Sequence, residues 1–427
     1  MKSVLIRGGR VVDAGGERVA DVAVEDGRIA AVVADGSDLS ADIVLDAGGC
    51  VVAPGLVDLH AHLRQPGREE AETVETGARA AALGGFTCVL AMPNTDPPVD
   101  SAGVAREVLE LGRDACCDVR TSAAITVGRQ GVQLTPMAEL AALGVRFFTD
   151  DGNGVQDGRL MRRALEYARG LGVTLAQHCE DDVLAAGGAM HEGAWSSRLG
   201  LPGQPAEAEE LMVMRDIALA RLTAGRVHFQ HLSTRRSVEL VVAAKAGGLP
   251  VSCEATPHHF TLTDEACASY DPVFKVNPPL RTEDDVAAVR AGLAGGVIDC
   301  IATDHAPHPQ EDKEQPFDQA PPGMLGLETA LALALTHLDL PIVDLLALLS
   351  WRPAALLGAG DRHGGPIEAG RPANLCVVNP AATWTVDPAA LASRSRNTPY
   401  AGMTLTGRVR HTLLAGEPVV VDGEAQR

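Results

Sequence analysis

Apolar runs of strand length alternate with helix-forming stretches through the middle of the chain, and this alternation limits the possible folds most strongly. Ala-, Leu- and Arg-rich stretches with helical spacing, such as Glu70–Leu83 and Ala206–Leu222, separate the runs. Strands that alternate with helices eight times predict a parallel (β/α)₈ barrel of the TIM type, in the α/β class. The runs are Val51–Leu59, Phe86–Met92, Val119–Val127, Val145–Thr149, Thr174–Gln177, Val227–Gln230, Pro250–Glu254 and Val297–Ala302.

The two ends of the chain follow a different pattern. Short alternating segments lie before residue 53 and after about residue 360, and turn signals such as Asp26-Gly27 separate them. This pattern is typical of hairpins in an antiparallel sheet. We therefore expect a discontinuous β-sandwich domain, built from residues 1–52 and 361–427, beside a barrel domain of residues 53–360.

The charge balance argues against several classes of partner. A formal net charge of -20 disfavours nucleic acid and anionic membranes, since both select for clustered Lys and Arg. No apolar stretch is long enough to span a bilayer, and the N-terminus lacks the apolar run of a secretory signal. The nine cysteines show no CxxC pair and are expected to be reduced thiols in a cytoplasmic protein.

Two histidines stand at the end of the first predicted strand, in the stretch Val57-Asp58-Leu59-His60-Ala61-His62-Leu63-Arg64. Side chains on a strand alternate between its faces, so His60 and His62 point the same way, as two ligands of one metal ion should. By itself the pair is equally compatible with two polar residues at a strand end.

Other polar residues fall at strand ends too, and in a barrel these ends form the active-site face. They are Arg64, Asn94, Asp150 with Asp151, His178, His231, and Asp304 with His305. Imidazole and carboxylate ligands without thiolate suit zinc or a similar divalent ion. The candidate ligands number six: the histidines His60, His62, His178 and His231, Asp304, and one of the pair Asp150 and Asp151. Six ligands exceed one open tetrahedral site, so we expect two ions about 3.5–4 Å apart, bridged by a carboxylate and a hydroxide.

Several longer strings resemble the class I dihydroorotases of the amidohydrolase superfamily. They are His60–Gly67, Met92–Thr95, Phe148–Gly152, Val276–Leu280, Thr303–His308 and Gly326–Thr329, and the resemblance covers essentially the whole chain. It implies a zinc-dependent hydrolase that interconverts N-carbamoyl-L-aspartate and (S)-dihydroorotate plus water in de novo pyrimidine (UMP) biosynthesis.

The resemblance also implies a role for each ligand. His60 and His62 would hold one zinc ion together with Asp304, and His178 and His231 would hold the second. Asp151 and a hydroxide would bridge the two ions. Asp304 would be the catalytic proton shuttle, because a carboxylate within hydrogen-bond reach can take a proton from the nucleophile and deliver it to the departing nitrogen.

Many relatives bridge their metals with a carboxylated lysine on the fourth barrel strand. This chain has four lysines, Lys2, Lys245, Lys275 and Lys313, and none lies on that strand. Asp151 is therefore the expected bridge. Its neighbour Asp150 is the alternative, since a slip of one residue turns the side chain to the opposite face.

Substrate contacts are expected from His62, Arg64, Asn94, Asn277 and His308, and from Pro322 and Gly323 in a mobile covering loop, His308–Gly323. The bidentate guanidinium of Arg64 suits a carboxylate and supplies positive charge in an acidic protein. Pro322 could offer only its carbonyl, whereas Gly323 keeps its amide. We interpret His258, His259 and His305 as mainly structural.

Two alternative functions stay open. One is another cyclic amidohydrolase, acting on a hydantoin, allantoin or dihydropyrimidine, which Arg64 and the missing lysine disfavour. The other is a non-catalytic partner subunit of aspartate transcarbamoylase, although such a subunit is expected to have lost metal ligands. The expected partners are a small-molecule substrate and a second copy of the chain in a homodimer, with association with aspartate transcarbamoylase left open, and neither nucleic acid nor a membrane.

Overall fold

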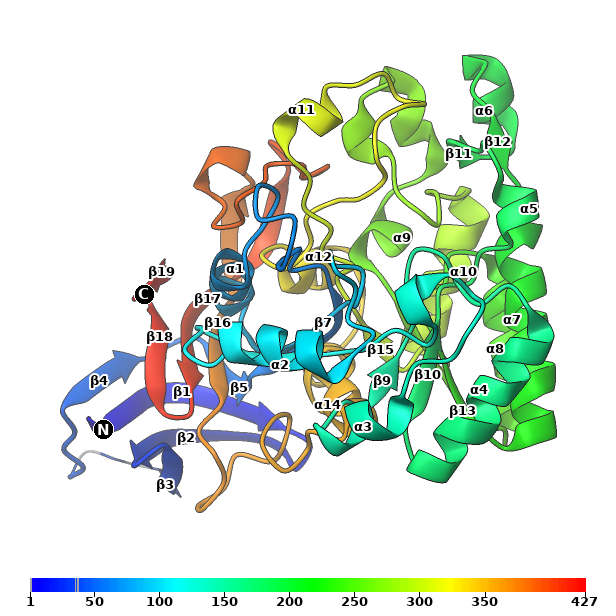
Figure 1. Cartoon of the computed structure of the whole chain (residues 1–427). Helices are drawn as coiled ribbons and strands as arrows, with labels where there is room; N and C mark the ends of the chain where they lie inside the picture. Colours follow the sequence, from blue (N-terminus) through cyan, green and yellow to red (C-terminus); the bar gives the residue numbers. More distant parts are fainter. Residues whose placement is uncertain (1, 35, 37) are drawn as a thin grey trace.

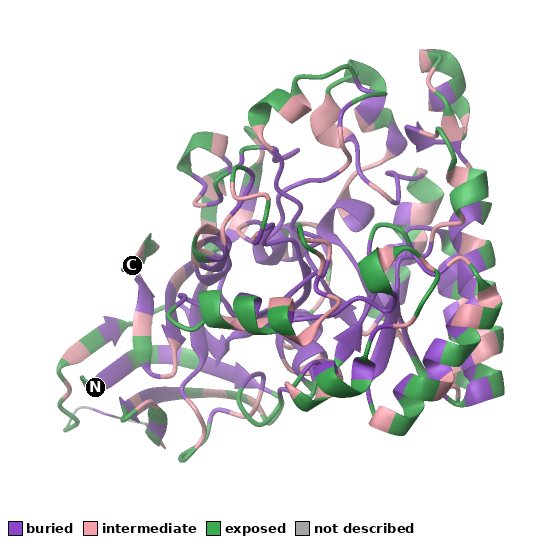
Figure 2. Cartoon of the chain, viewed as in Figure 1, coloured by how far each residue is buried: buried purple, intermediate pink, exposed green. Residues whose placement is uncertain are grey.

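The computed structural model describes residues 2–34, 36 and 38–427. Figure 1 shows a barrel of strands wrapped by helices and, beside it, a twisted sheet to which both ends of the chain contribute. The strands of the barrel are buried, whereas the outer faces of the surrounding helices are exposed (Figure 2). This arrangement confirms the predicted fold class.

The barrel strands pair in parallel throughout. They form two sheets, β6-β7-β8 and β9-β10-β13-β14-β15. Parallel bridges between Ala123 and Phe148 and between Ala61 and His305 join the two sheets and close the barrel. The strands are β6 (Leu56–Ala61), β7 (Phe86–Ala91), β8 (Asp118–Thr121), β9 (Phe147–Phe148), β10 (Thr174–Gln177), β13 (Arg226–Phe229), β14 (Val251–Ala255) and β15 (Cys300–Ile301).

Helices follow the barrel strands, and polar caps fix where several of them begin. The side chain of Asp157 accepts the backbone N–H groups of Arg159 and Leu160 at the start of α4, and Thr234 caps α8 in the same way. The longer helices are α1 (Val74–Leu83), α2 (Ala102–Leu111), α4 (Gly158–Leu171), α7 (Glu207–Thr223), α8 (Arg235–Ala246), α10 (Glu283–Ala294) and α12 (Ala330–His337).

Both chain ends build the second sheet, in the order β19-β18-β17-β16-β5-β1-β2-β3, with β4 paired to β1. Asp26 and Gly27 both adopt positive φ, 47° and 77°, which suits the tight turn expected between β2 and β3. The strands are β1 (Val4–Asp13), β2 (Gly16–Glu25), β3 (Arg28–Val33), β4 (Ile43–Asp46), β5 (Val51–Pro54), β16 (Leu375–Thr385), β17 (Thr404–Leu414), β18 (Glu417–Val421) and β19 (Glu424–Ala425).

The predicted single strand Val51–Leu59 is wrong, since the structure has two strands there. Residues of β5 pair with β1 and β16, whereas β6 begins at Leu56 and pairs with β7. Gly55 separates them where a Cβ atom would lie 2.2 Å from the side chain of Thr87, so the chain needs glycine to pass from sheet to barrel. The proposed domain boundary after residue 52 falls inside β5, and the division into domains stays a prediction.

Candidate metal centre

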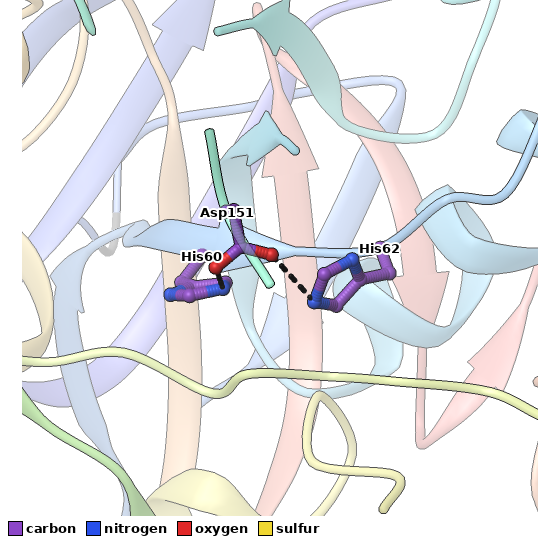
Figure 3. A group of neighbouring side chains, drawn as sticks. All are labelled: His60, His62 and Asp151. Carbon is purple, nitrogen blue, oxygen red and sulfur yellow. Dashed lines mark ion pairs between the residues drawn. The ribbon is translucent and has the colours of Figure 1, made fainter. Parts of the chain in front are cut away.

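The side chain of Asp151 lies between two histidines at the end of β6. Its Oδ1 atom is 3.3 Å from Nε2 of His60, and its Oδ2 atom is 3.6 Å from Nε2 of His62. Figure 3 shows both imidazoles turned toward this carboxylate. The alternation of side chains on β6 therefore brings His60 and His62 together as predicted.

Two further histidines reach the same carboxylate from the opposite side of the barrel. His178 follows β10 and His231 follows β13, and their Nδ1 and Nε2 atoms lie 3.7 and 3.9 Å from Oδ1 of Asp151. The ligand atoms of His60, His62 and Asp151 all lie within 4.8 Å of one another, and so do those of Asp151, His178 and His231. Asp151 thus belongs to two three-ligand groups.

Asp304 lies against the first of these groups. Its Oδ1 atom is 3.1 Å from Nε2 of His62 and 3.4 Å from Nε2 of His60. Burial raises the pKa of Asp304, but the neighbouring imidazoles of His60 and His62 lower it more, so the pKa lies well below the usual range. The carboxylate is therefore ionised.

The residues of these two groups fit divalent ions. Nε2 of His60 and Oδ1 of Asp151 are buried and have no hydrogen-bond partner among the described residues, although they face each other. Buried polar atoms without a partner are costly, and a cation between them would satisfy both. Imidazole nitrogens and carboxylate oxygens are ligands that zinc accepts.

Three of the residues at the centre have backbone conformations that side chains rarely adopt. The φ angles of Arg64, His231 and Asp304 are 61°, 33° and 45°. Such conformations cost on the order of 1–3 kcal/mol each and persist where the surrounding structure enforces them, commonly at functional sites. The strain therefore coincides with two of the predicted ligands, His231 and Asp304, and with the predicted substrate contact Arg64.

The neighbouring residues Asp150 and Asp151, which follow β9, turn their side chains in different directions. Asp150 accepts the backbone N–H of Thr126 at 3.0 Å and also its hydroxyl, and it belongs to neither ligand group. Asp151 turns the other way, toward the histidines. This geometry favours Asp151 over Asp150 as the bridging ligand.

A cavity of about 270 Å³, called here the metal-centre cavity, opens beside these ligands. Arg64 is buried on its wall, where Nε donates to the carbonyl of Pro307 at 3.1 Å. No carboxylate oxygen of the described residues lies within 4 Å of its guanidinium, so the charge is not paired. The residues predicted to contact substrate that line the cavity are His62, Arg64, Asn94, Asn277, His308, Pro322 and Gly323.

Asn94 contacts the ligands themselves. Its Oδ1 atom is 2.9 Å from Nδ1 of His62, and its Nδ2 atom donates to Oδ2 of Asp151 at 3.2 Å. Because the amide oxygen can only accept, Nδ1 of His62 carries the hydrogen and Nε2 is left to bind a cation. The structure therefore gives Asn94 an orienting contact that the sequence did not reveal.

The two ends of the loop His308–Gly323 line the cavity and are joined to each other and to a neighbouring segment by hydrogen bonds. The carbonyl of Pro322 lies 2.9 Å from Nε2 of His308, while the amide of Gly323 donates to the carbonyl of Lys275 at 2.9 Å. A substrate contact from the Gly323 amide would therefore have to displace this hydrogen bond. Within the loop, α11 (Gln310–Lys313) is the one regular element in the described structure.

Two of the three histidines interpreted as structural, His259 and His305, have partners outside the ligand groups, whereas Nε2 of His258 is buried without a hydrogen-bond partner among the described residues. His305 lies 3.3 Å from the buried carboxylate of Glu72, and its Nδ1 accepts the backbone N–H of Gly326. His259 lies 2.7 Å from the hydroxyl of Thr256 and 3.0 Å from the carbonyl of Pro278. These contacts agree with a structural role for both residues.

Sequence reasoning missed Glu254 and His228, which lie directly beneath the ligands. Oε1 of Glu254 is 2.8 Å from Nδ1 of His60, and Oε2 is 3.0 Å from Nε2 of His228. An acid at the end of a predicted buried strand was the available signal for Glu254. His228 carried none, because it lies inside a strand.

No helix among residues 2–34, 36 and 38–427 combines the length and the apolar character that a membrane span requires.

Comparison with known proteins identifies relatives over the whole chain. A family model described as "Dihydro-orotase-like" matches residues 49–237. The dihydroorotase of Streptomyces coelicolor is 50% identical over 99% of this chain and 100% of its own length. The dihydroorotase of Mycobacterium tuberculosis is 49% identical over 99% of each chain.

Solved structures support the same placement. The L-hydantoinase (dihydropyrimidinase) of Arthrobacter aurescens superposes with a TM-score of 0.89 at 27% identity, covering 100% of this chain and 98% of its own. The dihydropyrimidinase of Brevibacillus agri has a TM-score of 0.86 at 23% identity over 99% of this chain and 96% of its own, and that likeness concerns the fold alone. Together with the sequence relatives, these findings show that the chain belongs to the dihydroorotase family, a group of metal-dependent cyclic amide hydrolases within the amidohydrolase superfamily.

Proposed function

We propose that this protein interconverts N-carbamoyl-L-aspartate and (S)-dihydroorotate in pyrimidine biosynthesis. The observation that carries the proposal is the position of Asp151, which belongs to two three-ligand groups at once. Two relatives named dihydroorotases, 50% and 49% identical to this chain over 99% of its length, support the same reaction. A buried guanidinium on the wall of the same cavity suits the carboxylate of this substrate.

We further propose two zinc ions per chain. His60, His62 and Asp304 would hold one, His178 and His231 would hold the other, and Asp151 would contact both. Divalent ions at these residues would lower the pKa of a bound water and polarise the ring carbonyl. The donor set consists of four imidazoles and two carboxylates, without a thiolate. Zinc, manganese or a similar ion accepts such a set.

Asp304 is the residue placed to move protons. In the hydrolytic direction a C–O bond forms at the ring carbonyl while its C–N bond breaks, so one proton must leave the attacking water and one must reach the nitrogen. The ionised carboxylate of Asp304 accepts the first proton at Oδ1 or Oδ2 and delivers it to the departing nitrogen. Cyclisation is the same path in reverse.

Arg64 orients the substrate. Its Nε is occupied by the carbonyl of Pro307, which fixes the direction of the guanidinium toward the cavity. A ring carboxylate paired with this guanidinium places the amide carbonyl toward the ligand groups. His62 and Asn94 are already engaged with each other, so their substrate contacts would be secondary to their orienting contact.

The direct test is the purified protein with zinc and dihydroorotate, followed by the loss of ring absorbance. We expect hydrolysis that increases with pH, because cyclisation consumes a proton, and the reverse reaction with N-carbamoyl-L-aspartate at lower pH. Turnover of hydantoin or dihydrouracil without turnover of dihydroorotate would instead identify another cyclic amidohydrolase. Folded protein that binds no zinc, and that added zinc does not activate, would support the non-catalytic partner.

From the family resemblance we propose that the chain forms a homodimer. The same resemblance makes aspartate transcarbamoylase the partner to test. Light scattering of the purified chain, alone and with the transcarbamoylase of the same organism, measures both. A mass of one chain at micromolar concentration would contradict the dimer.

A further inference from the structure

A fully buried carboxylate lies one layer beneath the metal centre, and the proposed reaction does not use it. Glu254 is on β14, and its side chain is inaccessible to solvent. Each of its oxygens meets one imidazole: Oε1 lies 2.8 Å from Nδ1 of His60, and Oε2 lies 3.0 Å from Nε2 of His228. Nδ1 of His228 in turn lies 2.8 Å from the hydroxyl of Ser252. The four side chains form one continuous chain of contacts.

The chemistry of the acceptor fixes the tautomer of His60. An ionised carboxylate can only accept hydrogen bonds, so Nδ1 of His60 must carry the hydrogen. The amide nitrogen of Gln230 lies 3.3 Å from the same Nδ1, but it is a donor and cannot replace Glu254 in this role. Nε2 of His60 is thus the nitrogen left to bind an ion, and this is the atom that faces Asp151 and Asp304.

His60 differs in this respect from the other three ligand histidines. Nδ1 of His62 meets the neutral amide of Asn94. Nε2 of His178 and Nδ1 of His231 have no hydrogen-bond partner within the described part of the chain, and the carboxylate nearest to Nε2 of His178, that of Glu180, lies 3.9 Å away. A charged acceptor makes a hydrogen bond about twice as strong as a neutral one and raises the basicity of the ligand nitrogen. One side of the centre thus has much stronger support than the other.

We propose that Glu254 is a positioning residue that holds His60 in its metal-binding tautomer, and that His228 in turn holds Glu254. The ion bound by His60 and His62 is therefore retained more tightly than the ion bound by His178 and His231. The inference rests on the proposed metal centre. It does not depend on which cyclic amide is the substrate, because metal affinity can be measured without substrate.

The neighbouring thiol of Cys300 provides a matched control. Cys300, His228 and Glu254 offer ligand atoms within 4.8 Å of one another, so the same cluster could in principle hold an ion of its own. Both nitrogens of His228 already have partners, which argues against that reading. Cys300→Ala removes the thiol and leaves the contacts of Glu254 intact.

The experiment titrates metal-free protein with zinc against a chromophoric chelator and resolves the two binding steps. Supporting contacts of this kind contribute about 10–100-fold to metal affinity. We expect Glu254→Gln, which keeps an acceptor but loses the charge, to weaken the tighter step about tenfold. Glu254→Ala should weaken it about 100-fold, and Cys300→Ala should leave both steps unchanged. At saturating zinc, activity of Glu254→Gln should recover to within a few-fold of wild type.

A second measurement reports the tautomer itself. Nitrogen-15 NMR of labelled histidine in the zinc-loaded protein should show ligand imidazoles with hydrogen on Nδ1, as expected for His60 and His62, and Glu254→Gln should shift one of these signals. Unchanged zinc affinity in Glu254→Gln overturns the proposal, even if Glu254→Ala fails to fold. A third equivalent of zinc that Cys300→Ala releases would also overturn it. If zinc binds as expected but dihydroorotate is not hydrolysed, the proposed reaction fails and this inference stands.

Discussion

Nη2 of Arg64 lies 3.3 Å from Nε2 of His308, and both side chains are buried on one wall of the metal-centre cavity. Burial, and then the adjacent guanidinium, lowers the pKa of His308 to about 2. The imidazole is therefore neutral at physiological pH, and the buried positive charge on this wall belongs to Arg64. A substrate carboxylate that enters the cavity would complete a pairing that the protein itself leaves open.

Arg64→Met should selectively impair substrates with a carboxylate. Truncating one partner of a buried, hydrogen-bonded charge pair costs about 2–5 kcal/mol, so kcat/KM for dihydroorotate should fall by at least about 30-fold. Turnover of a neutral cyclic amide such as dihydrouracil, if measurable, should change little. Arg68→Met is the matched control, because Arg68 lines the same cavity at its more exposed edge. Equal losses for both substrates in Arg64→Met would contradict a carboxylate contact.

Asp304→Asn should lower the rate of the chemical step. General acid–base catalysis contributes about 10²–10⁴-fold, and an amide cannot accept the proton that the carboxylate takes. We expect kcat to fall within this range while KM changes by less than a few-fold, as measured by steady-state kinetics in both directions. Metal analysis of the same variant is required, since Asp304 also lies beside His60 and His62. Full activity with normal metal content would remove Asp304 from the proton path.

Chelation should abolish activity and lower thermal stability together. Binding to the native state alone stabilises by about 2.7 kcal/mol when free ligand is at 100 times its Kd, so Tm should fall measurably on dialysis against chelator. Added zinc should restore both Tm and activity. Asp150→Asn should leave this response intact, because Asp150 contacts Thr126 and belongs to neither ligand group. Activity that survives complete metal removal would disprove the proposed centre.

The barrel and the convergence of polar side chains at its rim could be predicted because both depend on local patterns. Strand length, the alternation with helices and polar residues at strand ends are all visible along the sequence, and the His60–His62 pair needs only the period of a strand. The exchange of sheets at Gly55 was not visible, since β5 and β6 read as one continuous apolar run. What decides it is pairing with β16, more than 300 residues away.

The supporting contacts of the ligands could not be predicted for a different reason. Asn94 was expected to contact substrate, and only the closed barrel shows its amide on His62 and Asp151. Glu254 is the last residue of a predicted apolar strand, and this position alone does not show which side chain it contacts. Its role depends on its distance to His60, which belongs to a strand 194 residues earlier in the chain. Contacts between residues far apart along the chain leave no periodic signal.

Glu328→Gln should change how stability depends on pH. Burial raises the pKa of Glu328 to about 7, although the amides of Ala392 and Ser393 oppose this shift. Between its usual pKa and about 7, the folded state binds a proton that the unfolded state does not, so the wild type loses stability as pH rises through this window. Relative to wild type, Glu328→Gln should gain on the order of 1 kcal/mol per pH unit from pH 5 to 7. The measurement is the unfolding free energy of both proteins from urea titrations at pH 5, 6, 7 and 8. A difference between wild type and Glu328→Gln that stays constant across these pH values would contradict this.

Lys313→Met should loosen the loop over the cavity. Nζ of Lys313 donates to the carbonyls of Pro272 and Pro321 at 3.0 and 2.8 Å, so one ammonium joins α11 to two other segments. Burial, and then the neighbouring Lys275, lowers the pKa of Lys313 to about 7, so the group is mostly charged at pH 6, the pH of the measurement. Without it, three carbonyls in this region lose a charged donor at that pH, and a hydrogen bond to a charged group is worth about 1.5–3 kcal/mol. We expect faster amide hydrogen exchange across residues 308–323 and a KM raised by about tenfold with kcat nearly unchanged.

Lys245→Met is the matched control for that change. Lys245 also donates to a backbone carbonyl and pairs with Asp299, but it is on α8 and outside the lining of the metal-centre cavity. Its loss should lower Tm slightly and leave exchange in residues 308–323 and KM as in wild type. If Lys313→Met changed Tm alone, as expected for Lys245→Met, the ammonium would support the fold without holding the loop. A contact that holds the loop over the cavity predicts two effects together, a rise in KM and faster exchange in residues 308–323. Both effects should occur in Lys313→Met and neither in Lys245→Met.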